Sequence, residues 1–143
     1  MIPKTMSRFS VFIGTWNTTG NVFPVAEVSS SDLVATDTYL WVPGQHFILH
    51  QVDARFGGTV SRSIEIMGYD AKGKKHVSRS YSDQGMSEDF ILELQGRQWS
   101  ITGATVRFNG SFDASRNTLS GLWELKPPKS RWQRWIDLRL ERA

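Results

Sequence analysis

Hydrophobic and polar positions alternate along most of this chain, in short stretches that end at turn residues. Val60 to Tyr69 is a clear example, because it alternates and is rich in β-branched residues, which is typical of a strand. Turn signals such as Pro43-Gly44 and Gly57-Gly58 interrupt the alternation. The pattern predicts ten strands, over Thr15 to Phe23, Leu33 to Val42, His46 to Phe56, Val60 to Tyr69, Lys75 to Asp83, Met86 to Leu94, Arg97 to Thr102, Thr105 to Phe112, Thr118 to Leu125 and Trp132 to Arg142.

The spacing of these strands indicates the architecture. Short strands at a spacing of ~10–12 residues, joined by tight turns, are typical of an antiparallel sandwich or an up-and-down barrel. No long crossover separates successive strands, which favours the barrel. The sequence therefore predicts an all-β fold in which residues 1–143 form a single domain, an up-and-down antiparallel β-barrel of about ten strands.

The segment before the first strand has a different pattern. Thr5 to Ile13 places Met6, Phe9 and Phe12 or Ile13 on one side at helical spacing, which predicts a short N-terminal helical turn. Gly14 then allows a sharp backbone turn, and Trp16 brings a large apolar ring to the base of the first strand. We expect Trp16 to be buried against the helical turn, where it closes the bottom of the barrel.

The same alternation predicts which side chains face the barrel interior. Gly110 lies between Phe108 and Phe112, and Gly121 lies between large apolar residues, so we expect these glycines to leave room for a neighbouring ring and to widen the lumen for a ligand. On the fifth strand, the face that carries Arg79 is more apolar than its serine-rich opposite face. The predicted ligand-binding residues of the lumen are Trp16, Tyr39, Trp41, His50, Arg79, Tyr81, Phe108 and Trp123.

An inward Arg79 would need a partner, because a guanidinium cannot be deprotonated and its desolvation is costly. The predicted partner is Glu65, another inward acid or the carboxylate of a ligand. The alternative is an Arg79 that faces outward on its strand.

Composition narrows the classes of function. The chain has 39% hydrophobic and 22% charged residues and a net charge of +3, which is an ordinary globular composition that decides little about partners. The absence of cysteine excludes disulfides and thiolate chemistry. No apolar run is long enough for a signal peptide or a membrane span, so a cytoplasmic protein is expected.

Candidate chemistry is sparse. His46 and His50 lie four residues apart on a predicted strand, ~13 Å along it, which is too far to bind one ion, so no metal site is expected. His50 alone could act as a base or bind a haem iron, but we favour a histidine whose ring is satisfied within the barrel or contacts water. Basic residues cluster at Lys72 to Lys75 and near the last loop, beside Trp132 and Trp135. We interpret these basic residues as charges that keep the turns soluble, and we expect no nucleic-acid partner.

Several short motifs resemble those of a known superfamily. They are Gly14-Thr15-Trp16, Tyr39-Leu40-Trp41-Val42-Pro43-Gly44, Glu65-Ile66-Met67-Gly68-Tyr69-Asp70 and Phe108-Asn109-Gly110-Ser111-Phe112. With the helical turn and ten strands, they resemble the calycins (lipocalins, fatty-acid-binding proteins and nitrobindins) and, more closely, a bacterial calycin-like domain of unknown function.

The calycin resemblance implies a ligand-holding barrel. It also implies that an arginine late in the last strand packs over Trp16, and Arg139 is the candidate position, although alternation places Ile136 and Leu140 on the buried face instead. The nitrobindin resemblance raises haem as a possible cofactor. However, none of the three histidines lies in a late strand, so no cofactor is predicted and haem stays an alternative.

Three hypotheses about function follow. The first is a barrel that binds a small hydrophobic or amphipathic molecule without chemistry, and the lack of a paired acid and base favours it. The second is a cofactor-free isomerase or cyclase in which His50, Tyr39 or Tyr81 moves a proton. The third is a self-associating domain, a homodimer whose outward apolar residues would be Phe47, Leu49 and Trp135.

Overall fold

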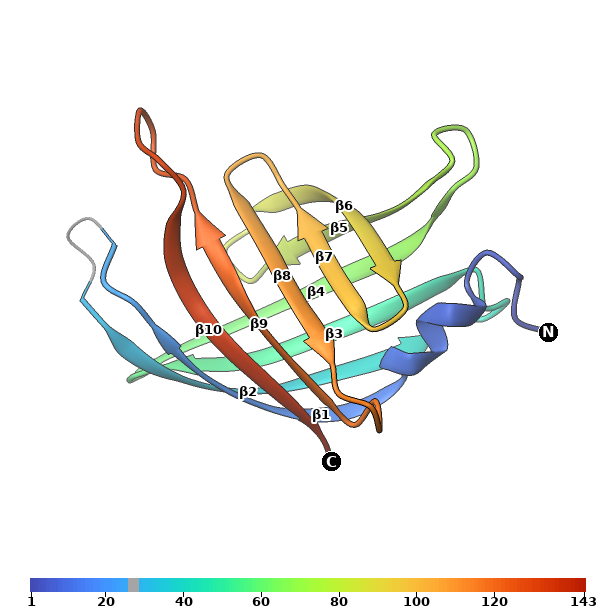
Figure 1. Cartoon of the computed structure of the whole chain (residues 1–143), viewed down its shortest axis with the longest axis horizontal. Coiled ribbons are helices and arrows are strands. Elements are labelled where there is room, and N and C mark those ends of the chain that lie inside the picture. The colour runs from blue at the N-terminus through green and yellow to red at the C-terminus, as the bar shows by residue number, and fades with distance from the viewer. Residues whose placement is uncertain (26–28) are drawn as a thin grey trace.

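A computed structural model, which describes residues 1–25 and 29–143, folds as a closed antiparallel barrel (Figure 1). Each strand pairs with its neighbours in the chain, and the first strand pairs with the last. The predicted up-and-down barrel is therefore confirmed, and every strand begins and ends within two residues of its predicted bounds. The elements are η1 (Ser7–Phe12), β1 (Gly14–Val22), β2 (Ser31–Trp41), β3 (Phe47–Phe56), β4 (Thr59–Asp70), β5 (Lys75–Ser82), β6 (Ser87–Gln95), β7 (Gln98–Thr102), β8 (Val106–Phe112), β9 (Thr118–Leu125) and β10 (Gln133–Arg142).

The short helix η1 closes one end of the barrel, as the blue ribbon in Figure 1 shows. Phe9 and Phe12 on this helix are fully buried, and the indole Nε1 of Trp16 donates a hydrogen bond to the carbonyl of Phe12 at 2.8 Å. The predicted burial of Trp16 against the helical turn is confirmed. Nowhere in residues 1–25 and 29–143 is there a helix long and apolar enough to cross a membrane.

The arginine over Trp16 is Arg142, and the assignment to Arg139 was wrong. The guanidinium of Arg142 lies 4.2 Å from the centre of the Trp16 ring and donates to the carbonyls of Ile13 and Val11. Arg139 is exposed and pairs with Glu141 at 2.7 Å. Alternation along β10 predicted its outward direction correctly.

Buried apolar residues divide into two clusters along the barrel axis. The larger cluster surrounds η1 and includes Trp16, Tyr39 and Phe108. The smaller cluster consists of Val22, Leu33, Ala35, Ala54 and Ile136, with partly buried rings and aliphatic side chains packed against it. The barrel is thus solidly packed at the helix end, and a second, separate apolar layer lines the other end.

Gly110 and Gly121 leave room for a neighbouring ring, as predicted, but the Phe108 ring fills that room, so the prediction that they widen the lumen for a ligand was wrong. They pair directly on β8 and β9, and a Cβ atom built on Gly121 would lie 2.5 Å from the carbonyl oxygen of Asn109 and 2.5 Å from the Phe108 ring. The ring of Phe108 therefore covers the two glycines. Their role is to let two strands and one ring approach closely.

Candidate functional site

Five adjacent strands, β1 to β5, each contribute one side chain to a chain of hydrogen bonds inside the barrel. Thr18 Oγ1 donates to Asp37 Oδ1 at 2.6 Å, and Asp37 Oδ2 lies 2.6 Å from His50 Nε2. The other ring nitrogen, His50 Nδ1, lies 2.8 Å from Glu65 Oε1. Ser78 Oγ donates to Glu65 Oε2 at 2.6 Å and ends the chain. We call these five residues the polar belt.

Barrel geometry brings the members of the polar belt together. His50 and Glu65 are directly opposite on β3 and β4, where inward side chains of neighbouring strands meet. Asp37, in contrast, is opposite Val52 and reaches His50 diagonally. Strands in a closed barrel tilt against its axis, so residues at one height are offset in register from strand to strand.

The polar belt has a net charge of −1 wherever its protons reside. Each ring nitrogen of His50 faces a carboxylate oxygen, and each of these contacts needs a proton between the two atoms. That requires an imidazolium between two carboxylates, or a neutral imidazole with one protonated carboxyl, and both arrangements sum to the same charge. Burial would lower the pKa of His50, but hydrogen bonds to Asp37 and Glu65 and their negative charges raise it from 6.5 to about 9. His50 is therefore the cation of the belt at neutral pH.

Tyr39 connects the polar belt to the packed end of the barrel. Its ring stacks on the His50 imidazole at 3.9 Å, nearly parallel, and on Phe12 of η1 at 5.3 Å. Burial, followed by the negative charges of Asp37 and Glu65, raises the pKa of Tyr39 well above its usual value. Tyr39 thus stays a neutral phenol that covers one face of the histidine.

A cavity of about 320 Å³ lies between the polar belt and the second apolar cluster, and it is partly open to solvent. Thr18, Asp37, His50 and Glu65 form part of its wall. The rest of the wall is largely apolar, and it includes the rings of Phe56, Phe90, Trp123 and Trp135 and the side chains of Leu33, Val52, Ile101, Val106, Ile136 and Leu138. A molecule in this cavity would contact hydrogen-bonding groups on one side and rings on the other.

The polar wall continues beyond the belt toward β6. Glu65 is opposite Ser80 on β5, and Ser80 is opposite Glu88 on β6. Glu88 lines the cavity, and it shares its face of β6 with the buried residues Phe90 and Leu92. No lysine or arginine is among the described residues that line this cavity.

The predicted lumen residues separate into three groups, of which the third, Arg79 and Tyr81, lies outside the barrel. His50 and Trp123 line the cavity. Trp16, Tyr39 and Phe108 are buried in the cluster around η1, and Trp41 is partly buried against the same cluster. Binding of a ligand by these residues remains a prediction, and the geometry places only the first group in contact with the cavity.

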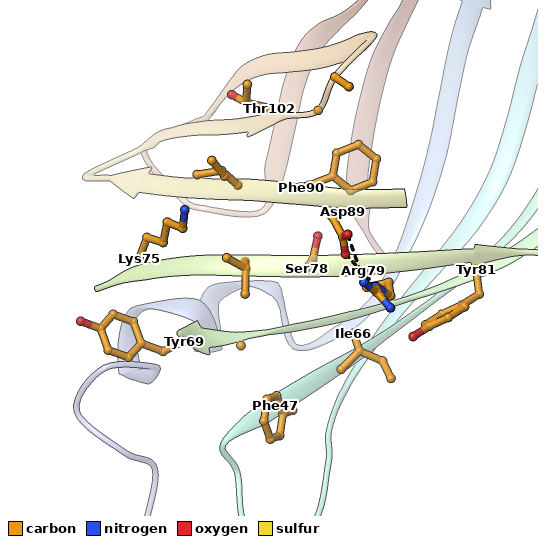
Figure 2. A pocket seen from close by; sticks show the side chains of 15 residues that line it. Phe47, Ile66, Tyr69, Lys75, Ser78, Arg79, Tyr81, Asp89, Phe90 and Thr102 are labelled. Carbon is orange, nitrogen blue, oxygen red and sulfur yellow. Dashed lines mark hydrogen bonds and ion pairs between the residues drawn. The ribbon is translucent and has the colours of Figure 1, made fainter. Parts of the chain in front are cut away.

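Arg79 and Tyr81 lie outside the barrel, so their predicted inward direction was wrong (Figure 2). Arg79 Nε pairs with Asp89 Oδ1 at 2.7 Å on the surface, not with Glu65. The inward face of β5 is the serine-rich one, because Ser78 supplies a hydrogen bond to the largely buried carboxylate of Glu65. A polar residue with a buried partner thus outweighs the apolar character of the opposite face.

An open groove of about 650 Å³ follows this outer surface, with Phe47, Ile66, Val77 and Ile91 among its apolar residues (Figure 2). Of the residues suggested for self-association, Phe47 is exposed here and Leu49 is half-buried. Trp135 was predicted to face outward, and that was wrong. A β-bulge between Arg134 and Ile136 shifts the register of β10, and Trp135 packs edge-on against Trp123 beside the cavity.

Sequence reasoning missed most of the polar belt. Glu65 was considered only as a partner for Arg79, and Thr18, Asp37 and Ser78 were not identified. The sequence contained a signal on β2, where alternation places Asp37 on the same face as the apolar residues Leu33 and Ala35. A carboxylate at a buried position of an alternating strand indicates a partnered group.

His50, the histidine considered as a haem ligand, has no free ring nitrogen. Haem iron is bound through a ring nitrogen with a free lone pair, and both nitrogens of His50 contact carboxylates. His76 Nε2 bonds to the carbonyl of Thr5 and its ring stacks on Phe9, while His46 precedes β3 in the β2–β3 connection. Within the described residues, no group of three His, Asp or Glu side chains is arranged to hold a metal ion.

Comparisons with solved structures show the fold. Rv2717c from M. tuberculosis matches 100% of this chain and 99% of its own length, with a TM-score of 0.76 and 12% identity. The S-type phycobiliprotein lyase CPES from Guillardia theta matches 97% of this chain and 92% of its own, with a TM-score of 0.54 and 8% identity. These matches confirm the predicted fold, a closed antiparallel barrel of ten strands. No protein-family model and no curated protein matches the chain.

Proposed function

We propose that this protein binds a small hydrophobic or amphipathic molecule in the cavity of the barrel lumen. The observation that carries the proposal is the two-sided wall of this cavity, with the polar belt on one side and aromatic rings on the other. Ligand pockets in proteins combine mainly apolar walls with a few placed polar groups, and they have volumes of about 300 Å³ or more. The calycin-like fold of the neighbours is compatible with this function.

The polar belt favours binding over proton-transfer chemistry. An isomerase or cyclase needs a group that is free to accept or donate a proton at the substrate. His50 has both ring nitrogens engaged with carboxylates, and Tyr81, one of the suggested proton donors, lies on the outside. Tyr39 stacks on His50 and does not line the cavity. We therefore propose a binding protein without a catalytic role for these residues.

The test is saturable binding of the neutral fluorescent dye N-phenyl-1-naphthylamine to delipidated protein. Ala35→Phe would place a ring in the cavity, because Ala35 is a small residue of its wall. Thr36→Phe is the matched control, since Thr36 is the next residue on β2 and is exposed on the outer face. We expect Ala35→Phe to weaken dye binding and Thr36→Phe to leave it unchanged. Absence of binding to the folded parent, or equal affinity in both variants, would overturn the proposal.

A further inference from the structure

The wall of the cavity carries a net negative charge. The polar belt contributes a net charge of −1 by the proton count above, and its members Asp37, His50 and Glu65 line the cavity. Glu88 adds a further negative charge to the same wall, one strand beyond Ser80. The whole protein has a net charge of +3, so its positive charges lie elsewhere.

Basic residues on the strands around the cavity do not line it, because their side chains contact other groups. Arg79 pairs with Asp89 on the outer surface, and Arg62 lies near Asp53, also outside. At the β10 end, the guanidinium of Arg134 lies over the ring of Phe23 and is not part of the cavity wall. A ligand carboxylate would therefore meet a net negative charge and no lysine or arginine among the described lining residues. The His50 imidazolium in this wall is already engaged at both ring nitrogens, by Asp37 and Glu65.

The wall also offers places for a cationic headgroup. Each carboxylate oxygen of Asp37 and Glu65 has one hydrogen-bond partner and retains a second lone pair that can accept another bond. The exposed carboxylate of Glu88 has no hydrogen bond or ion pair among the described residues. Across the cavity, Trp123 and Trp135 present aromatic rings, which attract ammonium groups through their faces.

We infer that the ligand of this cavity is an amphipathic cation, a protonated amine or a quaternary ammonium on an apolar body, and not a fatty acid. The inference rests on the proposed lumen binding and adds its charge selectivity. Glu88 and the polar belt receive the cationic group, while the apolar body lies among the rings and aliphatic side chains of the second cluster.

The test compares three probes that share one apolar chain, namely octylamine, 1-octanol and octanoate. Each is used at neutral pH to displace N-phenyl-1-naphthylamine, and the inhibition constants are compared. We expect octylamine, which is protonated at this pH, to bind about tenfold or more tightly than octanoate, with octanol between them. Equal affinities, or tightest binding by octanoate, would refute the charge selectivity and leave lumen binding intact.

Glu88→Gln and Glu93→Gln form a matched pair of variants. Both residues are exposed on β6 and both substitutions remove one negative charge, but Glu93 faces outward, where Gln95 donates to it. We expect Glu88→Gln to reduce the preference for octylamine several-fold and Glu93→Gln to leave it unchanged. The same reduction in both variants would show that only the overall charge matters and would refute the inference. Failure of all three probes and of the dye to bind the folded parent would contradict the proposed function itself.

Discussion

The charge of His50 predicts that the stability of this protein falls as the pH rises above neutrality. His50 is buried between two carboxylates, and its pKa is about 9 in the folded protein against 6.5 for an unperturbed histidine. A group with a raised folded-state pKa stabilises the fold fully below pH 6.5, and this contribution disappears as the pH rises through 9. The stabilising species is the imidazolium, which the carboxylates of Asp37 and Glu65 bind.

The magnitude follows from the size of the pKa change. One pKa unit corresponds to about 1.4 kcal/mol, so the full contribution is about 3.5 kcal/mol, and about 2.5 kcal/mol of it is lost between about pH 7 and pH 9.5. We expect the free energy of unfolding, measured by urea denaturation with tryptophan fluorescence, to fall by this amount. A fall of about 2.5 kcal/mol is a large fraction of the stability of a small domain.

Two histidine variants isolate the source of this pH dependence. His50→Gln removes the titrating group, and we expect the fall in stability attributed to it to vanish. His46→Gln removes a histidine from the β2–β3 connection, outside the belt, and we expect the parent's fall to persist. An equal fall in the parent and in His50→Gln would show that other groups cause it. If His50→Gln does not fold, an NMR titration of the parent that places the His50 pKa near 6.5 would refute the reasoning.

Three further tests address the packing, and two of them compare a matched pair of substitutions. Trp16→Ala should destabilise the fold by about 3–5 kcal/mol, because a fully buried ring is lost, and thermal melting measures this. Arg142→Ala should cost about 2 kcal/mol in urea through lost hydrogen bonds to backbone carbonyls, whereas Arg139→Ala, at an exposed ion pair, should stay within about 0.5 kcal/mol. Gly121→Ala should cost about 1–3 kcal/mol by steric overlap, and Gly58→Ala, where nothing lies within 4 Å, should be near neutral in the same assay. Similar effects within either matched pair would contradict the corresponding packing interpretation.

The fold could be predicted from the sequence because its signals are local. Turn pairs such as Gly57-Gly58 and the alternation between them determine where strands begin and end. Sequential hairpins then leave few ways to connect the strands. The closure of one barrel end by η1 was predictable for the same reason, since Phe9, Phe12 and Trp16 are close in sequence as well as in space.

The candidate site was harder to predict because its contacts join side chains on different strands. Each member of the polar belt lies on a different strand, and its partners are known only once the register is known. On β5, hydrophobicity alone predicted that Arg79 faces inward. The inward residue is Ser78, whose hydroxyl bonds to Glu65, and this bond offsets the cost of burying both groups. The alternation of residues along one strand does not reveal a hydrogen-bond partner on another strand.

The most direct test of lumen binding uses the indole resonances of the tryptophans in a ¹⁵N-labelled sample. The protein is titrated with the octyl probe that displaces the dye best. We expect saturable shifts of the Nε1–H signals of Trp123 and Trp135, which line the cavity. The signal of Trp16 should change little, because this ring is buried against η1. Unchanged Trp123 and Trp135 signals during saturable binding would place the ligand outside the lumen and contradict the central proposal.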